Sequence, residues 1–324
     1  MTEKVKKART AINGVLLLNK PLGISSTQAL GRAKWLIGAL KAGHTGTLDP
    51  LADGLLPLCF GHATKLAHDL LDADKTYEAR VVLGQTTTTG DVEGEVIASS
   101  DALVTRAQWD VIIPQFLGDI LQTPPMYSAL KKDGKPLYEY ARAGIEVERE
   151  ARAVKILNLE TVSFDYPHVV MNVTCSKGTY IRTLAQDMGD ALGVGAHLSG
   201  LRRTAVAHLQ LCDALTLEQL EAIPEPDRAA TLLPLDALLQ DAPAVYLPHA
   251  LAARFVQGQR LALNDLHDFN QDVVEGVTLR IYWQDTLQDA GQKTSQQPPV
   301  LLGLATQTRG VLSPQTVLMT VLPE

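Results

Sequence analysis

Residues 43–54, Gly-His-Thr-Gly-Thr-Leu-Asp-Pro-Leu-Ala-Asp-Gly, gather special backbone residues around the carboxylate of Asp49. Gly43 and Gly46 permit backbone dihedral angles that are closed to other residues, and Pro50 disfavours the α region for the residue before it. Asp49 is therefore expected in an extended, shaped loop. An ionised carboxylate presented in this way can act as a nucleophile or as a general base.

The same residue types also form ordinary turns, and the dipeptide Asp-Pro by itself commonly begins one. Local spacing thus leaves two interpretations of Asp49 open, a catalytic carboxylate and a turn residue. Evidence from other segments of the chain is needed to distinguish these two interpretations.

Packed elements are expected on both sides of this loop. The apolar run 14–21 predicts a buried strand, and residues 55–60 predict a second, shorter one. Between the first strand and the loop, Ser25 or Ser26 can cap a helix. The apolar residues of this helix recur at three- and four-residue spacing: Ala29, Leu30, Ala33, Leu36, Ile37 and Leu40. Such packing on both sides would hold Asp49 in place, as a preorganised site requires.

The remaining apolar pattern predicts further helices and strands. Helices are expected over 61–72, with Leu66, Leu70 and Leu71 inward, over 105–118, and over 180–192, where Thr179 is placed to cap. Strands are expected over 76–83, 153–162, 169–175 and 198–211. The polar run 85–94 predicts a loop near a binding surface.

Arg182 falls in the first turn of the helix expected at 180–192. A cation gains nothing from the helix dipole at that end. Its placement therefore suggests a carboxylate or phosphate partner.

Residues 122–152 form an irregular stretch, and such stretches inside a compact domain are usually functional or mobile. Five acids are mixed there with six basic side chains: Lys131, Lys132, Lys135, Arg142, Arg149 and Arg152. Two interpretations stay open, a solvated flap and an insertion that grips a ligand.

Length and charge limit the class of protein. A chain of 324 residues is long enough for two domains. The net charge is −7, but residues 1–41 hold eight basic side chains against one acid, so the remaining chain carries −14. This uneven charge argues against a uniformly basic protein and suits an anionic ligand that is met on one face.

The C-terminal part differs in composition from the rest. A linker-like region precedes it and contains five spaced prolines: Pro224, Pro226, Pro234, Pro243 and Pro248. Short strand-like runs then predict a small β-rich domain from about residue 246. Residues 284–299 are expected to be a mobile loop.

Cysteine usage and hydropathy bear on the compartment. Cys59, Cys175 and Cys212 are far apart and odd in number, so neither a disulfide framework nor a zinc site is indicated. The apolar run 15–18 is too short for a signal-peptide core or a membrane span. A soluble, cytoplasmic protein is therefore expected, with no membrane partner.

Six segments together carry a resemblance: GVLLLNKP at 14–21, GHTGTLDPLA at 43–52, DKTY at 74–77, PPMYSA at 124–129, GTYIR at 178–182 and LRRT at 201–204. In this order they resemble the TruB family of tRNA pseudouridine synthases over roughly residues 12–212. The resemblance implies an α+β catalytic fold over residues 1–245, built around a mixed, mostly antiparallel sheet. Residues 122–152 would then be a flap against the RNA arm. Residues 246–324 more loosely resemble the PUA-type RNA-binding domain of this family.

The resemblance also implies roles for individual residues. Asp49 matches the essential aspartate of the family, Tyr77 the aromatic residue that stacks on the target base, and Arg182 the basic partner of the aspartate. On this basis Asp49 is expected to be the catalytic residue.

Four further residues match supporting positions of the family pattern. Leu201 matches an apolar contact to the base, and His44 a residue that helps to hold the flipped-out loop open. Lys20 and Tyr180 match motif residues that support the site from below.

The implied reaction converts the uridine at position 55 in the T-loop of tRNA to pseudouridine. The N-glycosidic bond breaks and the uracil rejoins through its C5 atom, so no cofactor is required. The partner is tRNA; no obligate protein partner is predicted and a monomer is expected. Three routes stay open for Asp49: addition to the sugar C1′, addition to the uracil C6, and abstraction of a sugar proton.

Two residues depart from the family pattern. Asp53 stands where a small polar residue is common, and a second carboxylate near the site could oppose ionisation of Asp49. Ala207 stands where a glycine is frequent. Residues 241–324 also carry a net charge of −3, where an RNA contact would ordinarily bring positive charge.

Two other functions compete with the isomerase. One is an RNA-binding or RNA-remodelling protein that opens the tRNA elbow without chemistry. The other is a carboxylate-dependent hydrolase, for which Asp53 is the obvious second acid. The intact set of Asp49, Tyr77 and Arg182 favours the isomerase.

Overall fold

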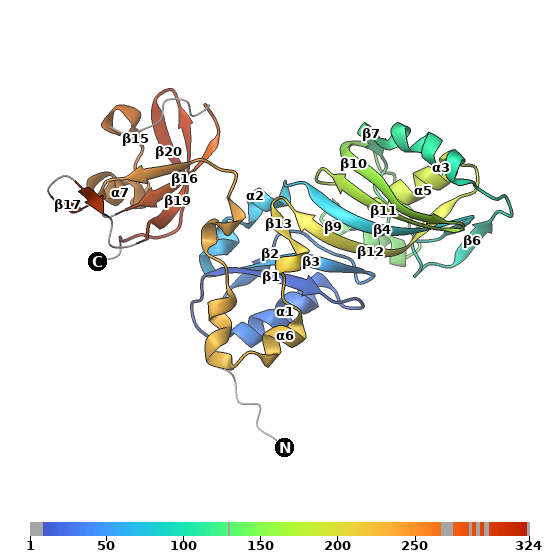
Figure 1. Cartoon of the computed structure of the whole chain (residues 1–324), viewed down its shortest axis with the longest axis horizontal. Helices are drawn as coiled ribbons and strands as arrows, with labels where there is room; N and C mark the ends of the chain where they lie inside the picture. The colour runs from blue at the N-terminus through green and yellow to red at the C-terminus, as the bar shows by residue number, and fades with distance from the viewer. Residues whose placement is uncertain are drawn as a thin grey trace, which may run out of the picture.

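A computed structural model describes residues 9–128, 130–266, 275–284, 287–289, 292–294 and 298–322 of the chain. Figure 1 shows a large sheet with helices packed against it and, at one end, a smaller β-rich unit formed by the C-terminal residues. Within the described residues, no helix combines the length and the apolar character that crossing a membrane requires.

The large sheet has nine strands and is mixed but mostly antiparallel. Its order is β1-β3-β12-β4-β11-β10-β7, with β2 paired to β3 and β13 paired to β12. Only the pairing of β12 with β3 is parallel, and it spans three residue pairs. The strands are β1 Gly14–Lys20, β2 Ala42–His44, β3 Ala52–Phe60, β4 Lys75–Leu83, β7 Gly118–Gln122, β10 Arg152–Asp165, β11 His168–Cys175, β12 Ala196–Val206 and β13 Leu209–Gln210. The predicted α+β class is confirmed.

Two helices border the Asp49 loop and the centre of the sheet. Helix α1, Ser26–Ile37, begins with a capping box in which the Ser25 hydroxyl accepts from the Gln28 N–H, so Ser25 is the cap. Helix α5, Ile181–Ala191, packs on β12 and β4. The apolar faces of both helices join one core cluster with β3, β4 and β11.

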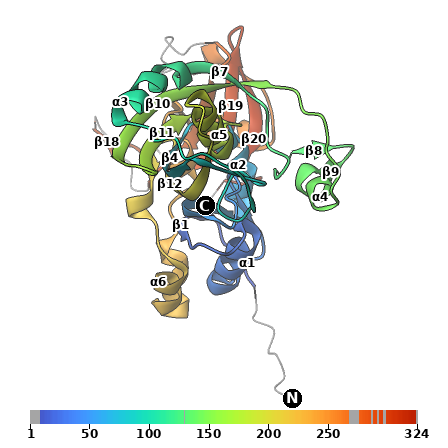
Figure 2. The same cartoon turned by 90° about the vertical axis from the view of Figure 1, so that its right-hand side faces the viewer.

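The chain up to residue 238 contains further helices and short strands outside the large sheet. They are η1 Gly61–Lys65, α2 Ala67–Leu71, β5 Gln85–Thr87, β6 Val96–Ser99, α3 Arg106–Ile112, η2 Ile113–Phe116, β8 Lys131–Lys132, β9 Lys135–Pro136, α4 Leu137–Arg142, η3 Leu211–Asp213, α6 Leu217–Ala222, η4 Glu225–Thr231 and η5 Leu235–Leu238. Figure 2 shows β8, β9 and α4 standing away from the sheet as one small unit, which corresponds to the predicted flap.

The C-terminal unit is a five-stranded sheet of order β14-β16-β19-β20-β15 with helix α7 packed on it. Its elements are β14 Ala244–Leu247, α7 His249–Val256, β15 Leu261–Ala262, η6 Leu263–Asp265, β16 Thr278–Trp283, β19 Val300–Thr308 and β20 Val311–Val317. A second apolar cluster joins Tyr282 and Leu304 of this sheet to Val15 and Leu17 of β1. The predicted β-rich C-terminal part is confirmed.

Several sequence predictions about local structure are wrong. Residues 61–72 form two short helices, and the break at Leu66 turns Leu71 outward. Thr179 does not cap α5, because the helix begins one residue later and the Thr179 hydroxyl donates to the Ser176 carbonyl. The run 85–94 is not wholly a loop, since β5 pairs with β6.

Two predictions about the C-terminal half also need correction. The proline-containing region is not a free linker, because Leu233 within it exchanges two backbone hydrogen bonds with Val15 of β1. An edge strand has unpaired N–H and C=O groups that such a segment can satisfy. The loop expected at 284–299 contains the paired strands β17 Leu287–Asp289 and β18 Gln292–Thr294, and the rest of it lies partly outside the described residues.

Candidate active site

The loop that carries Asp49 runs from the end of β2 to the start of β3. The hydroxyl of Ser26 fixes Leu48, the residue before Asp49. The Leu48 N–H donates to Ser26 Oγ at 2.8 Å, and Ser26 Oγ donates to the Leu48 carbonyl at 2.9 Å. Ser26 is buried in the first turn of α1. The helix therefore anchors the loop at the peptide next to Asp49.

Further main-chain bonds close the loop on the other side of Asp49. The Ala52 N–H donates to the Asp49 carbonyl at 3.0 Å, and the Gly23 N–H donates to the Pro50 carbonyl at 2.8 Å. The carboxylate itself stays half exposed, with 50% of the side chain accessible. The backbone is thus held while the carboxylate faces solvent.

Arg203 supports this loop from inside the protein. Its guanidinium donates to the Leu55 carbonyl at 2.7 Å and to the Gly46 carbonyl at 3.2 Å, and the side chain is fully buried. Gly54 has φ +102°, and any Cβ there would collide with the Arg203 backbone. A glycine at position 54 is therefore required for β3 and β12 to approach this closely.

Arg182 is the cation of the site, as its position in the helix suggested. One terminal nitrogen, Nη2, donates to Asp49 Oδ2 at 3.0 Å and to the Tyr127 carbonyl at 2.6 Å. The other, Nη1, donates to Asp91 Oδ2 at 3.0 Å and to the Thr89 carbonyl at 3.3 Å. The side chain is 8% exposed, so these four acceptors fix the guanidinium in one place.

Asp91 is a further member of this group, and the sequence by itself places it only within a polar loop. Its side chain is 2% exposed, and its second oxygen, Oδ1, accepts from Thr89 Oγ1 at 2.5 Å and from the Glu93 N–H at 3.1 Å. The buried pair of Arg182 and Asp91 is neutral overall. The negative charge that remains is on Asp49, at the solvent side.

The two tyrosines of the predicted site lie on neighbouring elements. Tyr77 is nearly buried on β4, opposite Arg203 of β12. Burial raises the pKa of its phenol, and the Arg203 cation opposes this shift. Tyr180 is the N-cap residue of α5, and burial raises the pKa of its phenol as well. Both phenols are therefore neutral near pH 7.

Leu201 and His44 lie on strands that meet beside the loop. Leu201 of β12 is the pairing partner of Ala52 in β3 and of Ala79 in β4, and it packs on the main core cluster. His44 ends β2, and its Nδ1 accepts from the Gly46 N–H at 3.4 Å. Burial, and after it Arg203, lower the pKa of His44, so its ring is neutral at pH 7. Within the described part of the chain, no hydrogen bond or ion pair joins either residue to the Asp49 carboxylate, so their roles stay predictions.

Lys20 is buried at the end of β1, where it is the pairing partner of Gly54 in β3. Its ammonium donates to the carbonyls of Pro21 at 2.9 Å and Ile24 at 2.7 Å. Burial lowers its pKa from 10.5 to about 8; Asp53 and Asp49 oppose the shift, and Arg203 adds to it. The lysine therefore shapes the turn that leads into α1.

Lys20 makes a testable contribution to pH-dependent stability. Between pH 8 and 10.5 the folded chain has released this proton while the unfolded chain still holds it, so stability should rise with pH. We expect the free energy of unfolding of wild type, relative to Lys20→Met, to increase across this window. Urea unfolding of both proteins at pH 7.5 and pH 10 measures the difference, and an unchanged difference would contradict the burial of a charged lysine.

Asp53, a residue that departs from the family pattern, forms an ion pair with Arg202. Its Oδ2 accepts from Arg202 Nη2 at 2.6 Å and from Arg202 Nε at 3.0 Å. Ala52 packs in the main core cluster and Leu55 in the second one, so the alternation of β3 puts Asp53 on the Leu55 face. The second carboxylate near the site is therefore compensated by Arg202.

Ala207 adopts a left-handed backbone with φ 48° between β12 and β13. This conformation favours glycine, which accounts for the residue that the family pattern carries there. The Ala207 N–H still donates to the Asp74 carbonyl at 2.9 Å, so the turn is kept.

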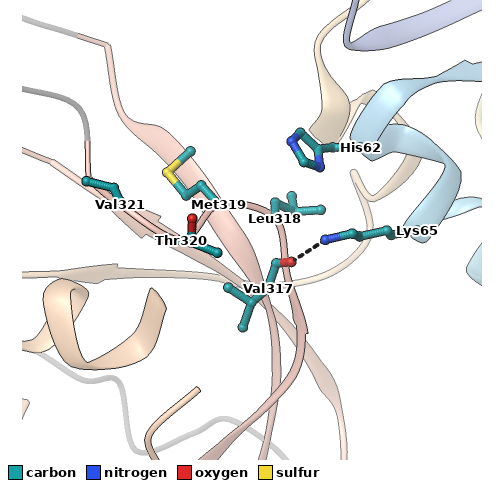
Figure 3. A pocket seen from close by; sticks show the side chains of 7 residues that line it. All are labelled: His62, Lys65, Val317, Leu318, Met319, Thr320 and Val321. Carbon is teal, nitrogen blue, oxygen red and sulfur yellow. Dashed lines mark hydrogen bonds between the residues drawn. The ribbon is translucent and has the colours of Figure 1, made fainter. Parts of the chain in front are cut away.

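A cavity of about 300 Å³ lies away from these residues (Figure 3). It is lined by His62, Lys65 and residues 317–321, and Lys65 donates to the Val317 carbonyl at 2.9 Å. It shares no residue with the group around Asp49. In the part of the chain that the structure describes, no three His, Cys, Asp or Glu residues are grouped to hold a metal ion.

Two family models match the part of the chain that contains the Asp49 loop and helix α5. A model described as "TruB family pseudouridylate synthase (N terminal domain)" matches residues 34–181, and one described as "tRNA pseudouridylate synthase B C-terminal domain" matches residues 182–240. The two matches together contain Asp49, Asp91 and Arg182.

Curated relatives extend the similarity to nearly the whole chain. A protein named tRNA pseudouridine synthase B from Burkholderia mallei (strain ATCC 23344) is 54% identical over 320 residues, which cover 99% of this chain and 98% of the relative. A protein of the same name from Cupriavidus pinatubonensis is 56% identical over 310 residues, which cover 95% of this chain and 94% of the relative.

The fold is also found among solved structures. A chain in the crystal structure of a Cbf5-Nop10-Gar1 complex matches with a TM-score of 0.70 and 27% sequence identity. The match covers 94% of this chain and 85% of that chain. Both the large sheet and the C-terminal unit therefore have a counterpart in a known structure.

Proposed function

This chain belongs to the TruB family of pseudouridylate synthases, and from this premise we propose that it isomerises the uridine at position 55 in the T-loop of tRNA by means of Asp49. The chain is an enzyme, a pseudouridine synthase of the isomerase class. The specific uridine and the role of the aspartate are the two parts of the proposal.

One observation carries the role of Asp49: its half-exposed carboxylate is held 3.0 Å from a buried guanidinium whose charge Asp91 already compensates. Because Arg182 is fixed by three other acceptors, it can orient Asp49 without moving during the reaction. Such preorganised charge is the usual source of electrostatic stabilisation in enzymes.

The neighbouring side chains suit a flipped-out pyrimidine. Tyr77 and Leu201 both pack on the core cluster that lies beside the Asp49 loop, and they would form an aromatic and apolar floor for the uracil. Stacking of a base on an aromatic ring contributes about 1–3 kcal/mol, which offsets part of the cost of unstacking the base. Asp49 could then add to the sugar C1′, add to the uracil C6 or remove a sugar proton.

The overall division of the chain follows from the same proposal. Residues 1–245 would be the catalytic domain, the flap at 122–152 would contact the T-arm, and residues 246–324 would be a PUA-like domain with a small RNA contact. The flap keeps exposed cations for this purpose, including Lys131 and Lys132. A cytoplasmic monomer that needs no protein partner and no cofactor completes the proposal.

Mapping the product tests the proposed substrate. Wild-type protein is incubated with an unmodified tRNA transcript and with the same transcript carrying cytidine in place of uridine 55. We expect one pseudouridine per tRNA, at position 55, in the first transcript and none in the second. A product at another uridine would contradict the assigned position, and tight binding without product would favour an RNA-remodelling function.

A further inference from the structure

Gln122 is a buried amide to which the site described above assigns no role. It is the last residue of β7, where it pairs with Arg152 of β10, and its side chain is 2% exposed. The carboxamide makes two hydrogen bonds to one residue: the Tyr180 N–H donates to Oε1 at 3.0 Å, and Nε2 donates to the Tyr180 carbonyl at 3.3 Å.

Helix α5 depends on this amide for the position of its first turn. The helix begins after Tyr180, whose side chain provides no cap, and Thr179 bonds to Ser176 instead. The first N–H groups of a helix have no partner within the helix, so they need partners from elsewhere. Gln122 fixes the backbone of Tyr180 against the sheet, only two residues before Arg182.

Tyr127, five residues after Gln122, makes a second contact with the first turn of α5. The Tyr127 carbonyl accepts from Arg182 Nη2 at 2.6 Å, and this nitrogen also donates to Asp49. Residues 122–127 therefore contact the first turn of α5 at both of their ends, at the Tyr180 backbone and at the Arg182 guanidinium. These residues are also the root of the flap.

We propose that Gln122 is a positioning residue for Arg182, and that through Arg182 it couples the root of the flap to the alignment of Asp49. The proposal rests on the proposed role of Asp49. Asp91 and Thr89 hold Nη1 of the guanidinium, whereas the flap root and Asp49 share Nη2. A tilt of the first turn of α5 would therefore move the nitrogen that orients the carboxylate.

The test compares Gln122→Met, which keeps the length of the side chain and removes both hydrogen bonds, with wild type. We expect kcat for pseudouridine formation to fall about 10- to 100-fold, because small misplacements of catalytic groups have effects of this size. The dissociation constant for tRNA, measured by filter binding, should stay within about twofold, since Gln122 is buried and does not face the RNA.

Gln219→Leu is the matched control. Gln219 also lies at the start of a helix, α6, where its side chain accepts from the Thr216 N–H at 2.8 Å. This variant loses a glutamine hydrogen bond at a helix start on the exposed surface, and its kcat should match that of wild type. If Gln219→Leu and Gln122→Met lose the same share of activity, the effect is one of stability and the proposal is wrong.

A double variant separates positioning from a general structural role. Asp91→Asn alters the other side of the Arg182 guanidinium, so Gln122→Met combined with it should lose less activity than the product of the two single losses. Losses that multiply would show that Gln122 acts independently of Arg182 and would overturn the proposal.

Gln122→Glu replaces Gln122→Met if the methionine variant does not fold. The glutamate keeps the acceptor for the Tyr180 N–H and removes the donor to the Tyr180 carbonyl. Wild-type kcat in Gln122→Glu would then overturn the proposal.

Asp49→Asn in the same assay distinguishes this inference from the proposed function. Activity in Asp49→Asn would remove the premise, whatever Gln122→Met does. An inactive Asp49→Asn together with a fully active Gln122→Met would contradict only the role of Gln122.

Discussion

Asp49→Asn is expected to reduce single-turnover formation of pseudouridine in tRNA by at least about 10³-fold, because loss of a group that attacks the substrate has effects of this order. The amide cannot serve as nucleophile or base, yet it has the shape of the carboxylate and can still accept from Arg182 Nη2. Affinity for tRNA should therefore change by no more than about threefold. Rapid-quench assays and filter binding measure the two quantities separately.

Glu221→Gln provides the control for this substitution. Glu221 lies on α6 and is paired with Arg32 of α1 at 2.6 Å, and its side chain is 49% exposed, close to the 50% of Asp49. Removing that charge should leave turnover unchanged. Product formed by Asp49→Asn at the wild-type rate would show that the carboxylate takes no part in the chemistry.

Asp91→Asn is expected to have the second-largest effect, on both stability and turnover. Neutralising one partner of a buried ion pair costs up to about 3–5 kcal/mol in the free energy of unfolding, and here only the half-exposed Asp49 would remain to compensate Arg182. The new amide would also present a donor to Arg182 Nη1, which is itself a donor. The guanidinium should shift, and kcat should fall about 10²-fold.

The surface pair of Arg106 and Asp110 gives a matched comparison for Asp91. Their atoms are 2.7 Å apart, but both side chains are about half exposed. Asp110→Asn should change the free energy of unfolding by less than about 1 kcal/mol, as is usual for exposed pairs, and should not change kcat. Urea unfolding and turnover of both variants give the comparison, and an equal loss of stability in Asp110→Asn would contradict the special role of the buried pair.

The surroundings of Asp49 were predictable because their causes are local. Pro50 restricts the residue before it, the alternation and apolar runs of 14–21 and 55–60 form β1 and β3, and a serine before a helical pattern supplies the cap of α1. Each of these causes acts over a few residues. The same holds for the position of Arg182 in the first turn of α5.

The partners of Arg182 could not be predicted from local patterns. Asp91 is 91 residues away along the chain, and nothing in its polar loop distinguishes it from an exposed turn residue before the fold buries it. Thr179 looked like a helix cap, but the backbone of Tyr180 stays extended and is held by Gln122 of β7. Asp53 looked like a rival carboxylate until the pairing of β3 with β12 supplied Arg202.

By itself, the sequence pointed to Asp49 as the candidate carboxylate and determined which segments flank it, because backbone restriction and hydrophobic periodicity act within short stretches. The ordered motifs also indicated to which family the chain is related. Only the tertiary structure decided which charges compensate one another around Asp49. Ion pairs and buried hydrogen bonds join residues far apart in the chain, and their strength depends on burial, which exists only once the sheet and helices have packed.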